Sequence, residues 1–271
     1  MSEIFSYGTA RTGWLRKLGF LHFQYKDLTC KLHVHREIEI VIVTEGVLSM
    51  KIAGQEYAVP AGSAIFVEPY EPHSYDSPQN NKCTLIEFTH NIYQPFYDWV
   101  KQYYTKERIA KIPPEYSQAL SSALSDAYEL WNITIEPIHA QAILAPLCYI
   151  FIRNCTWAVN EHKRNDLFLD ALDIISSSPI KEISRSFVAD KLGVTPETLS
   201  RKFKESSNLS FVNYLQHFRI SQVIDCLAKG YQIADAAEEA GFGDIRNFNR
   251  VFKEIMGCTP TEYLRNSNKI D

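Results

Sequence analysis

The chain has 271 residues, of which 45% are hydrophobic and 22% are charged, and this composition excludes a disordered or collagen-like protein. The length fits two compact domains of about 100–150 residues each. With 28 basic against 32 acidic side chains the formal net charge is −4, which excludes a protein that coats DNA through bulk attraction.

The N-terminus and the most apolar stretch bear on localisation. The first residues, Met-Ser-Glu-Ile, lack the basic start and apolar core of a secretory signal. The most apolar helical stretch, from Ala140 to Ile152, is shorter than the ~18 residues of a membrane span, and it contains Pro146. We therefore expect a cytoplasmic protein with no membrane partner.

The first ninety residues show the period-two alternation of β-strands, with turn-forming residues between the runs. The alternating apolar residues are Leu32, Val34, Ile38, Ile40, Ile42, Leu48, Met50, Ile52, Ile65 and Val67. Turns are expected at Glu45-Gly46, at Ala53-Gly54-Gln55 and at Pro60-Ala61-Gly62. Short strands at this spacing predict a β-barrel or sandwich over residues 1–94.

A histidine-rich motif lies within this β region. The segment from His33 to Gly46 matches the cupin pattern H-x-H-x3-E-x6-G, and Pro60-x-Gly62 with the later His73 resembles the second cupin motif. On a single strand, period two would place His33, His35, Glu37 and Glu39 on one face. Two imidazoles, one carboxylate and a returning imidazole could hold Mn, Fe, Ni or Zn. The candidate metal ligands are therefore His33, His35, Glu39 and His73.

The same region could bind an organic effector without metal. Imidazoles and carboxylates can hydrogen-bond a polar molecule, and aromatic rings can stack on its apolar face. The candidate effector-binding residues are His33, His35, Glu37, Glu39, His73, Phe66 and Tyr75. A sugar suits such residues, although phenolic, amino-acid or peptide effectors would use similar ones.

From about Pro95 the apolar period becomes helical. Three helices are predicted, over 95–109, 115–131 and 137–159, because Pro113-Pro114 and Pro137 interrupt the pattern. Their apolar faces could pack on the β-domain or form a two-fold dimer contact. The polar residues 161–166 are the predicted linker. The expected domains are 1–94 for the β-domain, 95–160 for the helical dimerisation or packing segment, and 167–271 for an all-helical domain.

The helical domain contains an internal repeat. The segment from Arg201 to Glu205 (R-K-F-K-E) recurs 49 residues later as R-V-F-K-E from Arg250 to Glu254. Upstream, the A-x-x-x-G pattern that ends at Gly193 recurs at Gly241. Two copies of a helical unit of about 50 residues are therefore present.

Each copy reads as a helix-turn-helix. Gly193 and Gly241 permit the turns, and Thr195 and Asp244 are suited to cap the second helices. The second helix of such a motif enters the DNA major groove, where Arg can pair with guanine and Asn with adenine. The predicted DNA-facing residues are Glu197, Thr198, Ser200, Arg201 and Lys204 in the first copy, and Ile245, Arg246, Asn247, Asn249 and Arg250 in the second.

A helix from Ser210 to Lys229 is predicted between the copies, with Ser210 as N-cap and Gly230 as the stop. About 18 residues make a spacer of roughly 27 Å. Such a spacer could hold two reading helices about one DNA turn apart, so that one chain reads two adjacent major-groove segments.

These repeats resemble the AraC/XylS family of bacterial transcription regulators. The resemblance covers about residues 167–267, and it includes the closing segment Gly257-Cys258-Thr259-Pro260-x-x-Tyr263. It implies an N-terminal cupin-type effector domain, a helical dimerisation element, a homodimer, and contact with RNA polymerase. Two departures are Glu197, which is acidic at a base-facing position, and Gly243, where a serine is usual.

The expected fold is therefore α+β with two domains: an N-terminal cupin-like β-barrel with a helical segment, and a C-terminal all-α double helix-turn-helix. The expected function is a ligand-responsive regulator that binds double-stranded DNA, activates carbohydrate-utilisation genes and is not an enzyme. This interpretation requires no cofactor, and a divalent metal ion in the cupin-like domain stays open as an alternative. The alternative is a metal-dependent cupin enzyme with a helical appendage.

Overall fold

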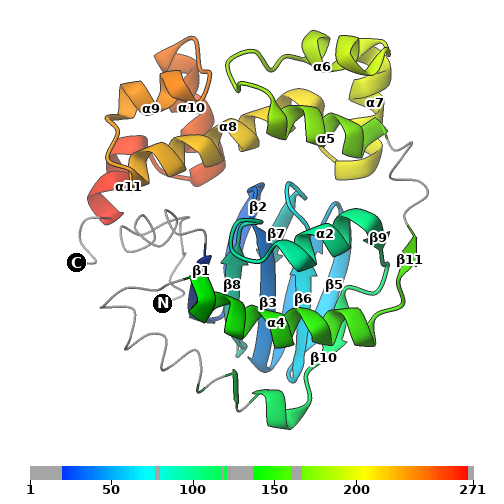
Figure 1. Ribbon diagram of the computed structural model, residues 1–271. Coiled ribbons are helices and arrows are strands. Elements are labelled where there is room, and N and C mark those ends of the chain that lie inside the picture. Colours follow the sequence, from blue (N-terminus) through cyan, green and yellow to red (C-terminus); the bar gives the residue numbers. More distant parts are fainter. Residues whose placement is uncertain are drawn as a thin grey trace.

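The computed structural model describes residues 20–76, 80–117, 119–120, 122, 137–159 and 167–267. It shows a sheet-rich N-terminal domain and a helical C-terminal domain that lies across one end of it (Figure 1). None of the helices in these ranges has both the length and the apolar character that a membrane span requires.

The N-terminal domain contains two facing antiparallel sheets. The five-stranded sheet has the order β1 (Phe20–Lys26), β8 (Lys82–Phe88), β3 (Ile38–Glu45), β6 (Ser63–Val67) and β10 (Ile109–Lys111). The four-stranded sheet has the order β2 (Thr29–His33), β7 (His73–Asp76), β4 (Val47–Ile52) and β5 (Gln55–Pro60). The sheets are not closed into the barrel that we expected, although the domain remains cupin-like.

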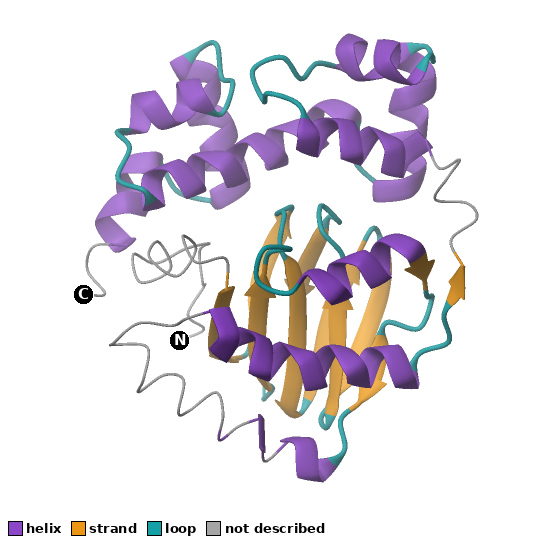
Figure 2. Cartoon of the chain, viewed as in Figure 1, coloured by secondary structure: helices purple, strands orange, loops and turns teal. Residues whose placement is uncertain are grey.

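The central strand β3 is buried on both faces. Val41 and Val43 pack between the two sheets, where Leu48 and Met50 of β4 meet them. The alternate residues, such as Ile40, face the helices α2 (Gln94–Gln102) and α4 (Pro137–Asn154). Figure 2 shows these two helices across the outer side of the larger sheet. The predicted strand is confirmed, but its second face is covered rather than solvated.

Two predicted helices are shorter than expected. The helix predicted over 95–109 ends at Gln102, and the chain continues as the short strands β9 (Tyr103–Tyr104) and β10. The helix predicted over 137–159 ends at Asn154, and β11 (Ala158–Val159) then pairs with β9. Of the helix predicted over 115–131, only the part up to residue 122 is among the described residues, and the predicted linker 161–166 lies outside them.

The C-terminal domain has two helical cores that share one long helix. Its helices are α5 (Leu167–Ser177), α6 (Arg185–Leu192), α7 (Pro196–Ser207), α8 (Phe211–Ala228), α9 (Ile233–Glu239), α10 (Ile245–Met256) and α11 (Pro260–Ser267). The first half of α8, including Phe211 and Phe218, packs in one core, and the second half, including Val223 and Leu227, packs in the other. The predicted spacer is therefore part of both cores.

The helix boundaries follow from local hydrogen bonds. Thr195 accepts a bond from the backbone N–H of Thr198 at the start of α7, and Asp244 does the same for α10. Ser210 caps α8, as predicted. Gly193 ends α6 in the left-handed region at φ 66°, a conformation that glycine adopts without steric penalty.

Candidate DNA interface and ligand site

The first helix-turn-helix presents a polar face to solvent. In α7, Leu199 and Phe203 are fully buried against the first core, which orients the opposite side outward. Of the five residues predicted to face DNA in this copy, three are exposed and two are half-buried. The exposed ones are Glu197, Arg201 and Lys204, and the half-buried ones are Thr198 and Ser200.

The second helix-turn-helix repeats this arrangement in α10. Phe248, Val251 and Phe252 are fully buried, so the other face of the helix is held outward. All five predicted residues of this copy are exposed, namely Ile245, Arg246, Asn247, Asn249 and Arg250. Ile245 is 47% exposed and is one of the large apolar side chains that face solvent in the described part of the chain.

Each of the two equivalent arginines lies near a glutamate four residues further along its helix. Arg250 donates to both carboxylate oxygens of Glu254, at 2.7 and 2.8 Å, and to the side-chain oxygen of Asn247. Arg201 lies 3.9 Å from the carboxylate of Glu205, one turn further along its helix. Such exposed pairs are weak, so both arginines can exchange them for contacts with DNA at little cost.

A second site lies where the two sheets of the N-terminal domain meet. His33 is the last residue of β2 and pairs with His73, the first residue of β7. His35 lies in the connection to β3, and Glu39 is the second residue of that strand. The expectation that these residues share one strand face is wrong, because the chain crosses between sheets at 34–37. The crossover nevertheless brings His33, His35, Glu39 and His73 together.

The three imidazole rings surround a small volume. The ring centroids of His33 and His73 are 4.0 Å apart, and those of His35 and His73 are 4.8 Å apart. One ligand atom from each of the four side chains lies within 4.8 Å of all the others. All four residues are buried, and His73 is completely inaccessible. The cluster therefore has the dimensions of a site for one ion.

The electrostatics of the cluster centre on Glu39. Its carboxylate accepts a hydrogen bond from the Tyr75 hydroxyl and lies 3.5 Å from Nε2 of His35 and 3.6 Å from Nε2 of His73. Burial raises the pKa of Glu39, but the histidines outweigh it and lower the pKa to about 2. Burial lowers the pKa of His35, but Glu39 and the neighbouring carboxylates raise it to about 9. Burial and the two other rings lower the pKa of His33.

Of the remaining predicted effector residues, one lies in the cluster and two do not. Tyr75 belongs to the cluster through its bond to Glu39. Glu37 is directed to Arg36, whose Nε donates to it at 3.1 Å, and it is not among the four converging groups. Phe66 is on the other face of the larger sheet, where it packs on Phe96 and other rings. The structure therefore does not bring Phe66 to the cluster.

The end of β2 and the start of β7, which carry His33 and His73, lie beneath α8 of the C-terminal domain (Figure 1). The Tyr214 hydroxyl donates to the backbone oxygen of Tyr70 at 3.0 Å, and the ring of Tyr70 packs on Phe218. His217 is close enough to His33 to lower its pKa, and burial lowers the pKa of His217 itself to about 4. Sequence reasoning missed these contacts, although His217 within an apolar helix face was a signal.

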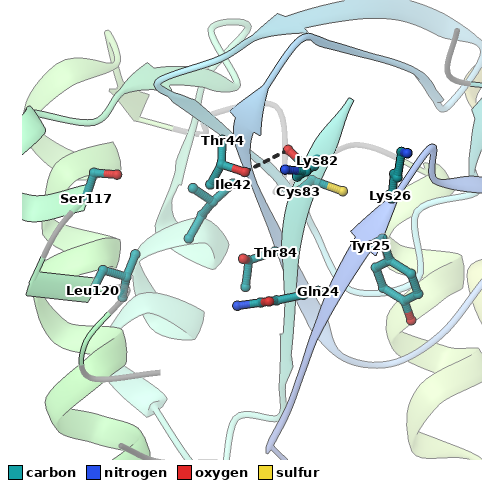
Figure 3. A pocket seen from close by; sticks show the side chains of 10 residues that line it. All are labelled: Gln24, Tyr25, Lys26, Ile42, Thr44, Lys82, Cys83, Thr84, Ser117 and Leu120. Carbon is teal, nitrogen blue, oxygen red and sulfur yellow. Dashed lines mark hydrogen bonds between the residues drawn. The ribbon is translucent and has the colours of Figure 1, made fainter. Parts of the chain in front are cut away.

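A cavity of about 470 Å³ lies apart from the cluster (Figure 3). It is lined by Gln24, Tyr25, Lys26, Ile42, Thr44, Lys82, Cys83, Thr84, Ser117 and Leu120. In the close-up, Gln24, Ile42 and Thr84 face the side of Ser117 and Leu120, whereas Tyr25 points away from them. The volume is within the range of small-molecule pockets, and sequence reasoning did not identify this place.

Two family models match the chain. The model described as an AraC-like ligand binding domain matches residues 20–144, and the model described as a helix-turn-helix domain matches residues 188–266. The matched ranges correspond to the sheet-rich domain with its helices and to the two helix-turn-helix units.

Curated relatives are similar along most of the chain. The HTH-type transcriptional activator RhaS of Enterobacter sp. (strain 638) is 23% identical over 241 residues, which is 85% of this chain and 86% of the relative. The HTH-type transcriptional activator RhaR of Mannheimia succiniciproducens is 24% identical over 250 residues, and the match covers 86% of both chains.

Solved structures share the fold. ToxT from Vibrio cholerae O395, in complex with (E)-4-(8-methylnaphthalen-1-yl)but-3-enoic acid, superposes with a TM-score of 0.61 at 15% identity. The superposition covers 92% of this chain and 99% of ToxT. Wild-type ToxT of V. cholerae strain SCE256, with an unsaturated fatty acid bound, gives a TM-score of 0.60 at 14% identity, over 91% of this chain and 95% of ToxT.

Proposed function

Because this chain belongs to the AraC/XylS family and is a ligand-responsive, DNA-binding transcription regulator, we propose that it activates carbohydrate-utilisation genes by reading DNA through α7 and α10. One observation carries this proposal: α8 belongs to both helix-turn-helix cores and also contacts the ligand-binding domain, at β2 and at the backbone oxygen of Tyr70. A ligand that changes the cluster can thereby act on both reading helices.

We propose that the exposed face of each reading helix contacts base edges. The arginines can donate two hydrogen bonds to one guanine, and Asn247 and Asn249 can pair with adenine. Glu197 favours a cytosine partner, because its carboxylate accepts from the cytosine amino group. The exposure of these side chains and the net charge of −4 support binding that depends on correct contacts rather than on bulk attraction.

The effector is a small polar molecule in this proposal, with a sugar as the first class to test. One place for it is the buried cluster of His33, His35, Glu39, His73 and Tyr75, with Glu37 beside it in the connection between β2 and β3. The cavity of Figure 3 is the second place, because Gln24, Thr44 and Thr84 offer amide and hydroxyl groups to a sugar.

The relatives are transcription regulators, and we extend this to propose that the chain has no enzymatic activity of its own. We further propose that it acts in the cytoplasm as a homodimer that engages RNA polymerase. The exposed apolar residues Ile138 and Tyr149 of α4 support a contact between two copies through the helical segment.

Operator affinity with and without ligand tests this function. A duplex selected from a random pool by the full-length protein is titrated by fluorescence anisotropy in the presence of each sugar that shifts the melting temperature. We expect at least one such ligand to change the dissociation constant about 5-fold or more. Thr84→Val changes the cavity and His73→Gln changes the histidine cluster. The variant that no longer shows the ligand-induced rise in melting temperature identifies the site that the ligand occupies. Identical operator affinity with every ligand that binds contradicts the proposal.

A further inference from the structure

The histidine cluster has the internal support of a metal site. The Nδ1 atom of His33 lies 2.8 Å from the backbone oxygen of Lys31, and that of His73 lies 2.8 Å from the backbone oxygen of Glu71. The Nδ1 atom of His35 lies 3.2 Å from the backbone oxygen of Glu37. A carbonyl can only accept, so each of these nitrogens donates to it, and Nε2 is the ring nitrogen that remains to bind a metal ion once it carries no proton.

Glu39 supplies a carboxylate with a similar support. The Tyr75 hydroxyl donates to Oε1 of Glu39. Nε2 of His35 lies 3.5 Å from Oε2, and Nε2 of His73 lies 3.6 Å from Oε1. Nε2 of His73 is fully buried, and no hydrogen-bond partner for it occurs among the described residues. A buried polar atom without such a partner is costly, and a metal ion would satisfy it.

The spread of the four groups suits one ion. Two ligands on opposite sides of an ion, with bonds of about 2.1 Å each, are about 4.2 Å apart. The four candidate ligand atoms lie within 4.8 Å of one another, which is close to this span. Three imidazoles and one carboxylate favour Mn²⁺, Fe²⁺, Ni²⁺ or Zn²⁺ over Ca²⁺ and Mg²⁺, which prefer sets of oxygen ligands.

We propose that His33, His35, Glu39 and His73 bind one divalent transition-metal ion, and that this ion is a ligand to which the regulator responds. The second half of this proposal rests on the proposed function. It follows from position, because β2 contacts both α8 and α10. Tyr214 and Phe218 of α8 pack on Tyr70, and Arg36 lies 4.0 Å from Asp225 of the same helix. An ion therefore changes the charge directly beneath the helix that joins the two DNA-reading units.

Metal stoichiometry tests the site. Full-length protein is treated with a chelator, dialysed against micromolar Zn²⁺, and measured by mass spectrometry of the bound metal. We expect one Zn²⁺ per chain in the wild type and in His139→Ala, an exposed histidine on α4 that serves as the control. We expect Glu39→Gln and His73→Gln to bind Zn²⁺ more than about 100-fold more weakly. A wild type that retains no Zn²⁺, or variants that retain it like the control, overturns the site.

The absorption spectrum of Co²⁺ bound to the wild type identifies the ligand types without any substitution. It therefore tests the site even if the variants do not fold. Nitrogen and oxygen ligands give visible bands without the intense near-ultraviolet absorption of a cobalt–thiolate bond. This distinction matters because Cys30 Sγ lies 3.5 Å from Nδ1 of His33. Thiolate absorption, or no visible bands at one equivalent of Co²⁺, overturns the assignment of the four ligands.

Operator affinity of the Zn²⁺-loaded and metal-free wild type tests the response. We expect the dissociation constants to differ about 5-fold or more, and we expect no difference for His73→Gln. If the Zn²⁺-loaded and metal-free proteins bind the operator with equal affinity, the metal is not a signal, although the metal site itself stands. Sequence-specific DNA binding by a protein that binds no metal overturns this inference while the proposed function stands, whereas a metal-loaded protein with no DNA preference contradicts the proposed function instead.

Discussion

Arg201 and Arg250 are equivalent residues of two copies of one motif, and each has a glutamate one turn further along its helix. The pairs with Glu205 and Glu254 lie on the exposed face of each helix. Arg250 is hydrogen-bonded to Glu254, whereas Arg201 and Glu205 are 3.9 Å apart, so the two pairs share a position on the helix and not a geometry. The shared position is what leads us to predict a contact with DNA at both arginines.

We predict that Arg201→Ala and Arg250→Ala each weaken operator binding by about 1–3 kcal/mol and relax the preference for one base pair. The measurement is a set of titrations with the operator and with duplexes that carry single base-pair changes. Arg153→Ala, an exposed arginine at the end of α4, is the control and should bind like the wild type. An equal loss of affinity for every duplex would show that the arginines contact phosphates instead of bases.

At the scale of elements, two glycines of the β-domain separate the cost of a left-handed backbone conformation from the cost of a steric clash. Gly46 and Gly62 both have φ in the left-handed region, at 71° and 78°. A Cβ on Gly46 would lie 2.3 Å from the backbone oxygen of Asn80, whereas a Cβ on Gly62 would meet nothing within 4 Å. The two positions therefore share the conformational cost of alanine and differ in the steric one.

We predict that Gly62→Ala destabilises the protein by about 1–2 kcal/mol and that Gly46→Ala destabilises it more. The reason is that the Asn80 backbone has to move for the second substitution only. Urea unfolding followed by circular dichroism measures both free energies of unfolding. Equal losses would mean that the segment at Asn80 yields freely and does not constrain the turn between β3 and β4.

The helical domain could be predicted closely from the sequence because its signals are local. The repeat, the apolar spacing and the caps at Thr195, Ser210 and Asp244 lie within single helices or turns, and the structure confirms them. The segment 103–109 was mispredicted as helix for the opposite reason. Thr105 accepts a bond from the backbone N–H of Glu107, which favours a turn, and distant strands then pair with this segment.

The candidate ligand site could be predicted only in part. The motif identified four residues that the structure brings together, but the argument from a single strand face was wrong because the chain changes sheets between His33 and Glu39. The contact of Tyr214 with Tyr70 joins residues 144 positions apart, and no local pattern reports such a pair. The placement of Phe66 behind the sheet likewise depends on helices that follow later in the chain.

At the scale of the whole molecule, the charge and the architecture fit together. A chain with a net charge of −4 gains little from unspecific attraction to DNA, so we expect its affinity to come from the two exposed faces that we propose to read DNA. These faces are joined by α8, whose 18 residues span about 27 Å. The same helix lies on the ligand-binding domain, so one rigid element connects the site to both readers (Figure 1).

We propose that one chain reads DNA through α7 and α10 together. Hydroxyl-radical footprinting of the full-length protein on its selected duplex tests this claim most directly. We predict that each bound chain protects two adjacent major-groove segments whose centres are about 10 base pairs apart, and that Arg201→Ala and Arg250→Ala each weaken one of them. Protection of a single segment per chain, or protection that is the same on any sequence, would contradict the account.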